Sequence, residues 1–342
     1  MPRQGHKGAL LELANFGIGT LGMIEVLNLA LPFFGLIIIG FVCGKIKQIP
    51  DTALAWMNFF IVYVSLPALF FRILSQTPLE QLARIDFIFA TTLSTFWAFA
   101  VAFAIGMAIR GGRIDESTIA GLAGGYGNIG YMGPGLALAT LGAQAAVPVA
   151  LIFCFDTLLL FSLVPFMMAV ASPEKKSIGS VALDVVRRIG TNPLVIATAL
   201  GIASAAIQFQ PPVAIERLMQ FLQNASAPCA LFTLGVTVAL RPLKKMPWEV
   251  PFLTAVKLLL HPVLMFLLLS LFGPFDQLWV DTAILMAALP PALNVFVFAR
   301  QYDTWVEQAS GAVLVGTIVS VVTLTSVMWM VKTGTLPPLL FR

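Results

Sequence analysis

The sequence predicts an all-α polytopic membrane protein with ten transmembrane helices, arranged as an inverted repeat of five and five. Two observations predict this fold class. The chain of 342 residues is 59% hydrophobic and only 11% charged, whereas a soluble domain carries about 25% charged residues. Its apolar residues also fall into runs of about 20, the length that a helix needs to cross the hydrocarbon core. A soluble enzyme is therefore excluded. Nucleic-acid binding is excluded too, because no basic cluster alternates with aromatic residues.

The first five spans are delimited by charges, prolines and glycines. In order they are 23–44, closed by Lys45 and Lys47; 51–74, with Asp51 at its start; 85–109, closed by Arg110 and Arg113; 118–142, which is weakly hydrophobic; and 145–170. We expect an N-terminal tail over residues 1–22, part of which could lie at the membrane interface. The first repeat then covers residues 23–171.

A polar segment separates the two halves. Residues 172–191 include four basic side chains and form the predicted cytoplasmic loop. The second repeat covers 192–332, and a C-terminal tail covers 333–342. The predicted spans of the second repeat are 192–209, 212–240, 251–272, 279–299 and 305–331.

The basic residues are distributed unequally between the two sides. With the N-terminus outside, the inner connections hold 12 Lys and Arg residues and the outer segments hold 7. Basic residues accumulate in cytoplasmic loops. The sequence therefore predicts that both termini lie outside.

The two halves match weakly at an offset of 161 residues. Five helices per half would place the halves in opposite orientations, as in many secondary transporters. Membrane helices match easily by chance, so unrelated helix kinks remain an alternative. The aligned identities are Pro32 with Pro193, Gly40 with Gly201, Ser65 with Ser226, and Pro67 with Pro228.

Two of the predicted spans are broken near their middle. Residues 124–135 contain six glycines and a proline, and residues 288–296 contain two adjacent prolines. Glycine costs about 1 kcal/mol and proline about 3 kcal/mol relative to alanine inside a helix. Unwound backbone is tolerated inside a membrane only where it is buried in protein or lines a wet cavity.

The breaks are the candidate substrate site. Half-helix N-termini attract anions, and two asparagines add amide donors. The alternative is a close-packing glycine cluster with ordinary proline kinks. The predicted substrate-binding residues are Asn128, Gly130, Gly133, Pro134, Pro290, Pro291 and Asn294.

Ionisable residues inside spans are candidates for coupling, because charges at the membrane centre are costly. Asp156 lies halfway along the fifth span and could carry a coupling proton or serve as a buried partner of Lys257. Lys257 could attract the anion or balance Asp156. His261 lies one turn from Lys257, on the same helix face, and is interpreted as a packed histidine.

Several motifs resemble those of the auxin efflux carrier family, which includes plant auxin exporters and bacterial permeases such as malonate transporters. The stretch 287–302 resembles the ninth helix of that family, and Asn128 with Gly133 and Pro134 resembles the fourth-helix motif. Asn192-Pro193 resembles the start of the sixth helix, and the stretch 228–235 resembles the seventh. Pro134 directly follows Gly133, where the family usually has one residue in between.

The resemblance implies broken fourth and ninth helices that cross, in an architecture like that of bile acid symporters and sodium–proton antiporters. Helices 1, 2, 6 and 7 would form a scaffold, and helices 3–5 and 8–10 a mobile domain that carries substrate in an elevator-like movement. We expect a homodimer through the scaffold helices. The short central loop lacks the regulated segment of the plant carriers, which favours a bacterial inner-membrane permease.

The predicted function is secondary transport of a small organic anion across the lipid bilayer. The substrate would be a dicarboxylate such as malonate or an auxin-like aromatic acid. The alternative is a sodium-coupled symporter of the bile acid symporter type, although the two breaks offer only Asn128 and Asn294 as side-chain amides and no Glu or Gln. We expect no cofactor and no metal site, since no ATP-binding loop or clustered cysteine pattern occurs. The sequence also lacks the motifs of an intramembrane enzyme.

Overall fold

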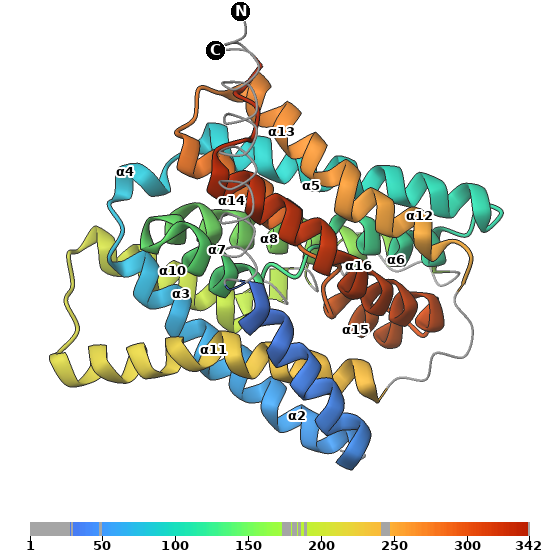
Figure 1. Ribbon diagram of the computed structural model, residues 1–342, viewed down its shortest axis with the longest axis horizontal. Coiled ribbons are helices and arrows are strands. Elements are labelled where there is room, and N and C mark those ends of the chain that lie inside the picture. Colours follow the sequence, from blue (N-terminus) through green and yellow to red (C-terminus); the bar gives the residue numbers. More distant parts are fainter. Residues whose placement is uncertain are drawn as a thin grey trace, which may run out of the picture.

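The computed structural model describes residues 28, 30–47, 50–172, 190–240 and 247–340, together with positions 179, 183, 186 and 187. Within these residues the regular elements are helices (Figure 1). The π turns η1 and η3 each interrupt a longer helical stretch. The first half contains a helix over Ala30–Lys47, then α2 (Asp51–Phe60), η1 (Ile61–Ser65), α3 (Leu66–Ser75), α4 (Leu79–Leu82), α5 (Ile85–Ile109), α6 (Ile114–Gly125), α7 (Gly133–Leu141), η2 (Ala143–Ala145) and α8 (Ala146–Ala171). The second half contains α10 (Pro193–Ala206), α11 (Val213–Ala239), α12 (Val250–Ala255), η3 (Val256–Leu260), α13 (His261–Phe272), α14 (Gln277–Ala287), α15 (Asn294–Gln301) and α16 (Val306–Thr333).

Seven of the described helices are long and apolar enough to cross a membrane. They coincide with the first, second, third, fifth, seventh, eighth and tenth predicted spans. The sixth predicted span falls on the shorter helix α10, and the fourth and ninth fall on the broken pairs α6/α7 and α14/α15. The helices therefore lie where the sequence predicts them. The inverted ten-helix repeat remains a prediction, and the predicted tail 1–22 lies outside the described residues.

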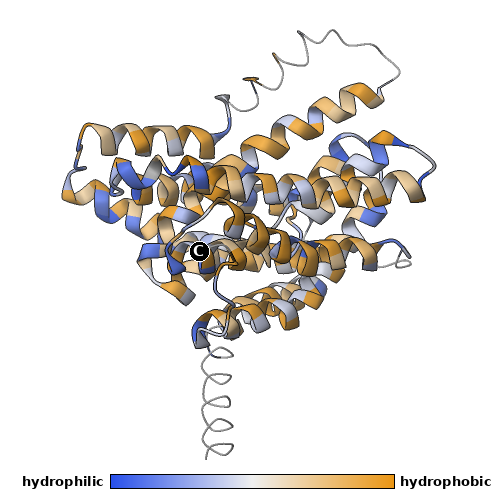
Figure 2. Ribbon diagram, turned by 90° about the horizontal axis from the view of Figure 1, so that it is seen from above, coloured by the Kyte–Doolittle hydropathy of each residue, from blue (hydrophilic) through white to orange (hydrophobic). Residues whose placement is uncertain are grey.

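Hydrophobic residues predominate in the helices (Figure 2), and many large apolar side chains are exposed. Large side chains such as Trp56, Phe221 and Val322 are exposed. An exposed apolar surface of this extent marks contact with lipid or with another protein. Together with the long apolar helices, it agrees with an integral membrane protein.

The helices pack in two groups. In the first group, α3 packs against α10 and α11, and Gly40 and Gly44 let the helix Ala30–Lys47 approach α11 closely. In the second group, α5 packs against α6, α8 and α13, while α16 packs against α12 and α15. The groups touch where α3 meets α8 and where α7 meets α11. We call them the scaffold group, which contains α2, α3, α10 and α11 with the first helix, and the core group, which contains α5–α8 and α12–α16.

The start of α10 shows how the sequence sets a boundary at this interface. The side chain of Asn192 accepts hydrogen bonds from the N–H groups of Leu194, at 2.9 Å, and Val195, at 3.4 Å. Pro193 occupies the first helical position, where its missing N–H costs nothing. Asn192 is thus the N-cap of α10, which agrees with the helix start expected at this dipeptide.

Candidate functional site

The two broken spans meet at their breaks. Residues 127 and 291 form an isolated antiparallel bridge between the segment after α6 and the segment after α14. The N–H of Asn128 donates to the carbonyl of Pro290 at 2.7 Å, and the N–H of Ala292 donates to the carbonyl of Tyr126 at 2.9 Å. An unpaired backbone N–H or carbonyl group in a membrane interior costs several kcal/mol, because no water is present to form the missing hydrogen bond. The breaks therefore satisfy part of each other's backbone.

The first N–H groups of the half-helices α7 and α15, which follow the breaks, donate to carbonyl groups of their own segments. Those of Met132 and Gly133 both donate to the carbonyl of Asn128 at 3.1 Å. Those of Val295 and Phe296 donate to carbonyl groups three residues earlier in the chain. An anion at the breaks would therefore depend on side-chain donors more than on these backbone groups.

A cavity of about 140 Å³ lies beside the bridge, between the scaffold group and the core group. None of the described residues that line it is charged. Polar atoms come from both sides of the interface, and aliphatic and aromatic side chains complete the wall. The lining residues are Val62, Leu66, Tyr126, Asn128, Gly130, Tyr131, Phe153, Thr157, Phe161, Asn192, Leu194, Ala292, Leu293 and Asn294.

Asn128 is the most distinctive group in this lining. Its side chain is 2% exposed, and its amide nitrogen Nδ2 has no hydrogen-bond partner among the residues that the structure describes. The other asparagine of the lining, Asn294, has its Nδ2 3.5 Å from the hydroxyl of Tyr126. Leaving a buried donor unpaired costs about 1–3 kcal/mol. Asn128 therefore has an amide donor available for a ligand that enters the cavity.

The seven predicted substrate-binding residues divide into two sets. Asn128, Gly130 and Asn294 line the cavity, as shown above. The other four build the framework around it. Gly133 and Pro134 begin α7, where a Cβ on Gly133 would come within 2.8 Å of Met286. Pro290 and Pro291 belong to the paired breaks.

Sequence reasoning missed several lining residues. Tyr126 lies within the glycine-rich break, so its position next to Asn128 was a usable signal. Thr157 follows Asp156 in a long apolar helix, and Val62 lies in η1, where the sequence shows no interruption of the second span. Their place at the cavity is decided by helix packing and not by any local pattern.

Asp156 and Lys257 are both buried in the core group, and they are linked through two other side chains. Oδ2 of Asp156 accepts a hydrogen bond from the hydroxyl of Thr95 at 2.8 Å, and that hydroxyl lies 3.4 Å from Nε2 of His261. Nδ1 of His261 lies 2.9 Å from Nζ of Lys257, which also donates to the carbonyl of Ala287. A polar chain thus connects Asp156 with Lys257, the residue that the sequence offers as its buried partner.

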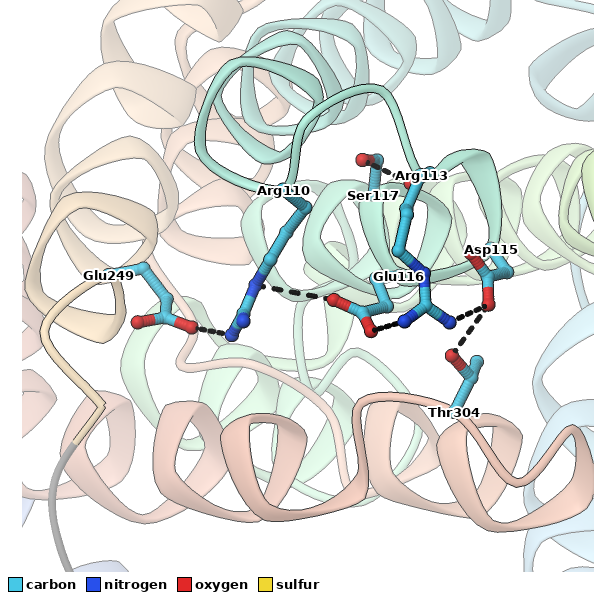
Figure 3. Close-up of polar contacts among 7 residues, drawn as sticks. All are labelled: Arg110, Arg113, Asp115, Glu116, Ser117, Glu249 and Thr304. Atoms are coloured by element: carbon cyan, nitrogen blue, oxygen red, sulfur yellow. Dashed lines mark hydrogen bonds and ion pairs between the residues drawn. The ribbon is translucent and has the colours of Figure 1, made fainter.

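A second polar cluster joins the end of α5 to the starts of α6 and α12 in the core group (Figure 3). Arg110, after α5, pairs with Glu249 at the start of α12 and with Glu116 of α6 at 3.3 Å. Arg113 pairs with Glu116 at 2.7 Å and with Asp115 at 2.9 Å. These contacts join three elements of one group and none of the other.

The cluster also reaches the connection between α15 and α16. Asp115, in the first turn of α6, accepts a hydrogen bond from the hydroxyl of Thr304 at 3.1 Å. Burial alone would raise the pKa of the Asp115 carboxyl. Hydrogen bonds from Arg113, the Glu116 backbone and Thr304 outweigh burial, and the pKa lies below its usual value.

Comparisons with known proteins identify the family of this chain. Residues 25–328 match the model of a family described as "Membrane transport protein". The chain is 50% identical over 319 residues to the "Putative malonate transporter" of Rhizobium meliloti (strain 1021), a match that covers 93% of this chain and 100% of that protein.

Two more distant relatives match a smaller part of the chain. Auxin efflux carrier component 1 of Arabidopsis thaliana is 28% identical over 140 residues, or 39% of this chain and 22% of that protein. The lysosomal cholesterol signaling protein of Mus musculus is 32% identical over 142 residues, or 39% of this chain and 16% of that protein. The chain thus spans only a minor part of these two proteins. Since the family model covers most of the chain, the protein is an integral membrane transporter that belongs to the auxin efflux carrier family.

Proposed function

We propose that this protein is a secondary transporter that binds a small organic anion in the cavity beside the paired breaks. The observation that carries the proposal is the unpartnered amide of Asn128. If the asparagine served only to satisfy the freed backbone, its side-chain nitrogen would be bonded to that backbone. Instead, the bridge between the breaks satisfies the backbone, which leaves the amide free for a carboxylate.

The size of the cavity favours a compact substrate. Its volume of about 140 Å³ corresponds to roughly five waters at ~30 Å³ each. Pockets for drug-sized ligands usually measure about 300–1,000 Å³. A short dicarboxylate therefore fits better than an aromatic acid. The name of the Rhizobium relative, with which this chain shares half of its residues, supports malonate as the first substrate to test.

The packing of the helices suggests how the anion crosses the membrane. The cavity is lined by Val62 and Leu66 from the scaffold group and by Asn128 and Asn294 from the core group. The breaks and the polar chain lie within the core group, which the cluster around Arg110 holds together. An elevator-like movement of the core group against the scaffold group would open the cavity to one side and then to the other. The protein would act in a bacterial inner membrane, as a homodimer joined by its scaffold group.

The test measures ligand affinity and melting temperature on the same purified variants. Asn128→Ala and Asn294→Ala each remove one amide, and a hydrogen bond to a charged partner contributes about 1.5–3 kcal/mol. Because 1.4 kcal/mol corresponds to about a tenfold change in affinity, malonate affinity is expected to fall about ten- to a hundredfold for each variant. The melting temperature without ligand should stay near that of the wild type. Asn224→Ala, on the exposed face of α11, is the matched control and should change neither quantity.

Two results would contradict the proposal. A lower melting temperature with unchanged affinity would show that the asparagines only support the breaks. Malonate binding that requires sodium would favour the sodium-coupled symporter, so each titration is repeated with sodium replaced by potassium.

A further inference from the structure

The polar chain of the core group ends directly behind the paired breaks. A Cβ built on Gly127 would lie 3.3 Å from both Cε and Nζ of Lys257, so the ammonium group packs against the backbone of the bridge. The same ammonium donates to the carbonyl of Ala287, the last residue of α14. Lys257 is fully buried, and it places a positive charge against Gly127, the residue that precedes Asn128.

The hydrogen bonds along the chain all run in one direction. Lys257 can only donate, so Nδ1 of His261 is assigned as the acceptor and Nε2 as the protonated nitrogen. His261 then donates to Thr95, and Thr95 donates to Oδ2 of Asp156. The chain thus connects a buried ammonium to a buried carboxylate through two neutral groups.

Within the described residues, one carboxylate oxygen of Asp156 is left without a hydrogen bond. Its side chain is 3% exposed, and its second oxygen, Oδ1, has no partner in the described part of the chain. An ionised carboxylate with an unpaired buried oxygen is costly. A proton on Oδ1 removes this cost and leaves the bond from Thr95 to Oδ2 in place.

Polar and ionisable side chains from several surrounding elements face Asp156. Helix α5 contributes Thr95, and η3 and α13 contribute Lys257 and His261. The segment after α6 contributes the phenol of Tyr126, which interacts electrostatically with Asp156 and also lines the cavity. Cys154, on the same helix as Asp156, instead donates to Thr198 of α10. Lys257 is therefore the cation that balances Asp156.

We propose that Asp156 is the binding site for a proton that travels with the anion, so that the protein is a proton–anion symporter. This inference rests on the proposed function. Without substrate, the charges of Asp156 and Lys257 cancel. With a dicarboxylate in the cavity and a proton on Oδ1, Lys257 balances one of the two negative charges of the dicarboxylate instead. The proton is taken from water on one side, forms an O–H bond with Asp156, and returns to water on the other side.

Electrostatics then enforces the coupling. Loading the dicarboxylate alone leaves two uncompensated negative charges inside the core group, whereas loading it together with the proton leaves one. Net charge in a low-dielectric interior is disfavoured, and the cost rises with the size of the charge, so the proton on Asp156 favours loading of the dicarboxylate. Movement of the core group is therefore expected in two states, either empty or loaded with both the anion and the proton.

The test uses the full-length protein in liposomes that enclose a pH-sensitive dye, with the membrane voltage clamped by potassium and valinomycin. Exchange of labelled malonate at equal pH measures anion movement, and the dye measures proton movement on addition of external malonate. The wild type is expected to exchange malonate and to acidify the lumen. Asp156→Asn imitates the protonated carboxyl, and it is expected to keep malonate exchange and to lose acidification. Asp281→Asn, on α14 and bound to Gln277, is the matched control and should behave as the wild type.

Each remaining outcome has a distinct meaning. A wild type that does not exchange malonate would refute the proposed function itself. A wild type that exchanges malonate without acidification would refute proton coupling alone. Acidification that persists in Asp156→Asn would show that the proton travels on the malonate and would also refute the site. If Asp156→Asn does not fold, Thr95→Val, which breaks the chain without removing a charge, is expected to reduce acidification per malonate exchanged. An unchanged ratio in that variant would overturn the proposal.

Discussion

Gly40 of the first helix lies against the backbone carbonyl of Phe232 in α11. The second half of the chain contains the same contact in reverse, since Gly201 of α10 lies against the backbone carbonyl of Phe71 in α3. The two contacts are related by the offset of 161 residues that aligns the two halves of the sequence. A chance alignment of kinked helices does not require such reciprocal contacts, so this pair favours a structural repeat in the scaffold group.

Adding a single methyl group at either glycine is expected to destabilise the scaffold group. In Gly201→Ala the new Cβ would come within 2.9 Å of the Leu74 side chain and 3.0 Å of the Phe71 carbonyl oxygen. Overpacking of a well-packed interface costs about 1–3 kcal/mol. We expect lower melting temperatures for Gly40→Ala and Gly201→Ala, measured by thermal denaturation of the purified protein.

Gly35→Ala provides the matched control on the first helix. Apart from the neighbouring backbone of its own helix, no atom of the described residues lies within 4 Å of a Cβ at this position, and alanine is favoured over glycine in helices by about 1 kcal/mol. The control should be as stable as the wild type or more stable. If all three variants melted alike, the close contacts would not exist in the protein.

The helices were largely predictable because their determinants are local. The third span was predicted over 85–109, and α5 covers Ile85–Ile109. Charges at Arg110 and Arg113 end the apolar run. The one charged residue of α5, Asp86, lies in its first turn, and the apolar remainder is long enough to span the bilayer. The breaks were equally readable, because glycine and proline disrupt helices by their own chemistry.

The contacts between distant segments were not predictable. The bond from Thr95 to Asp156 joins residues 61 positions apart, and the contact of Lys257 with Gly127 joins two different halves of the chain. The π turn η1 also gave no sequence signal, although it carries Val62 to the cavity. These features depend on how helices rotate and approach each other, which no local pattern records.

The stability contributed by Asp115 is expected to depend on pH. Because its pKa is lower in the folded protein than in the unfolded chain, its stabilising effect is complete above the unfolded value of about 3.9 and is lost as pH falls through the folded value. Asp115→Asn should therefore lower the melting temperature at neutral pH by the equivalent of roughly 0.2–1 kcal/mol. The difference from the wild type should disappear in acid.

Asp303→Asn is the control for that measurement. Asp303 is exposed and adopts a positive φ of 48°, a conformation that asparagine tolerates. It lies next to Thr304 but outside the ion pairs of the cluster. A pH-dependent loss in this variant, equal to that of Asp115→Asn, would show that the cluster is not the cause.

Lys257 and Asp156 are expected to be energetically coupled through the polar chain. Lys257→Met alone leaves a buried carboxylate without its cation, and breaking a buried charge pair in this way costs about 3–5 kcal/mol. Adding Asp156→Asn removes the stranded charge and should restore much of the melting temperature. Additive losses in the double variant, measured by thermal denaturation, would mean that the two charges do not compensate each other.

The apolar part of the scaffold wall should control transport through its shape alone. Val62 lines the cavity from η1, whereas Val64, two residues later on the same turn, does not. Val62→Phe adds bulk to a space of about 140 Å³ and should sharply reduce both malonate affinity and exchange in liposomes. Val64→Phe introduces the same side chain into the same helix and should leave both measurements near the wild-type values. If the two variants transported malonate equally well, the anion would not pass through this cavity.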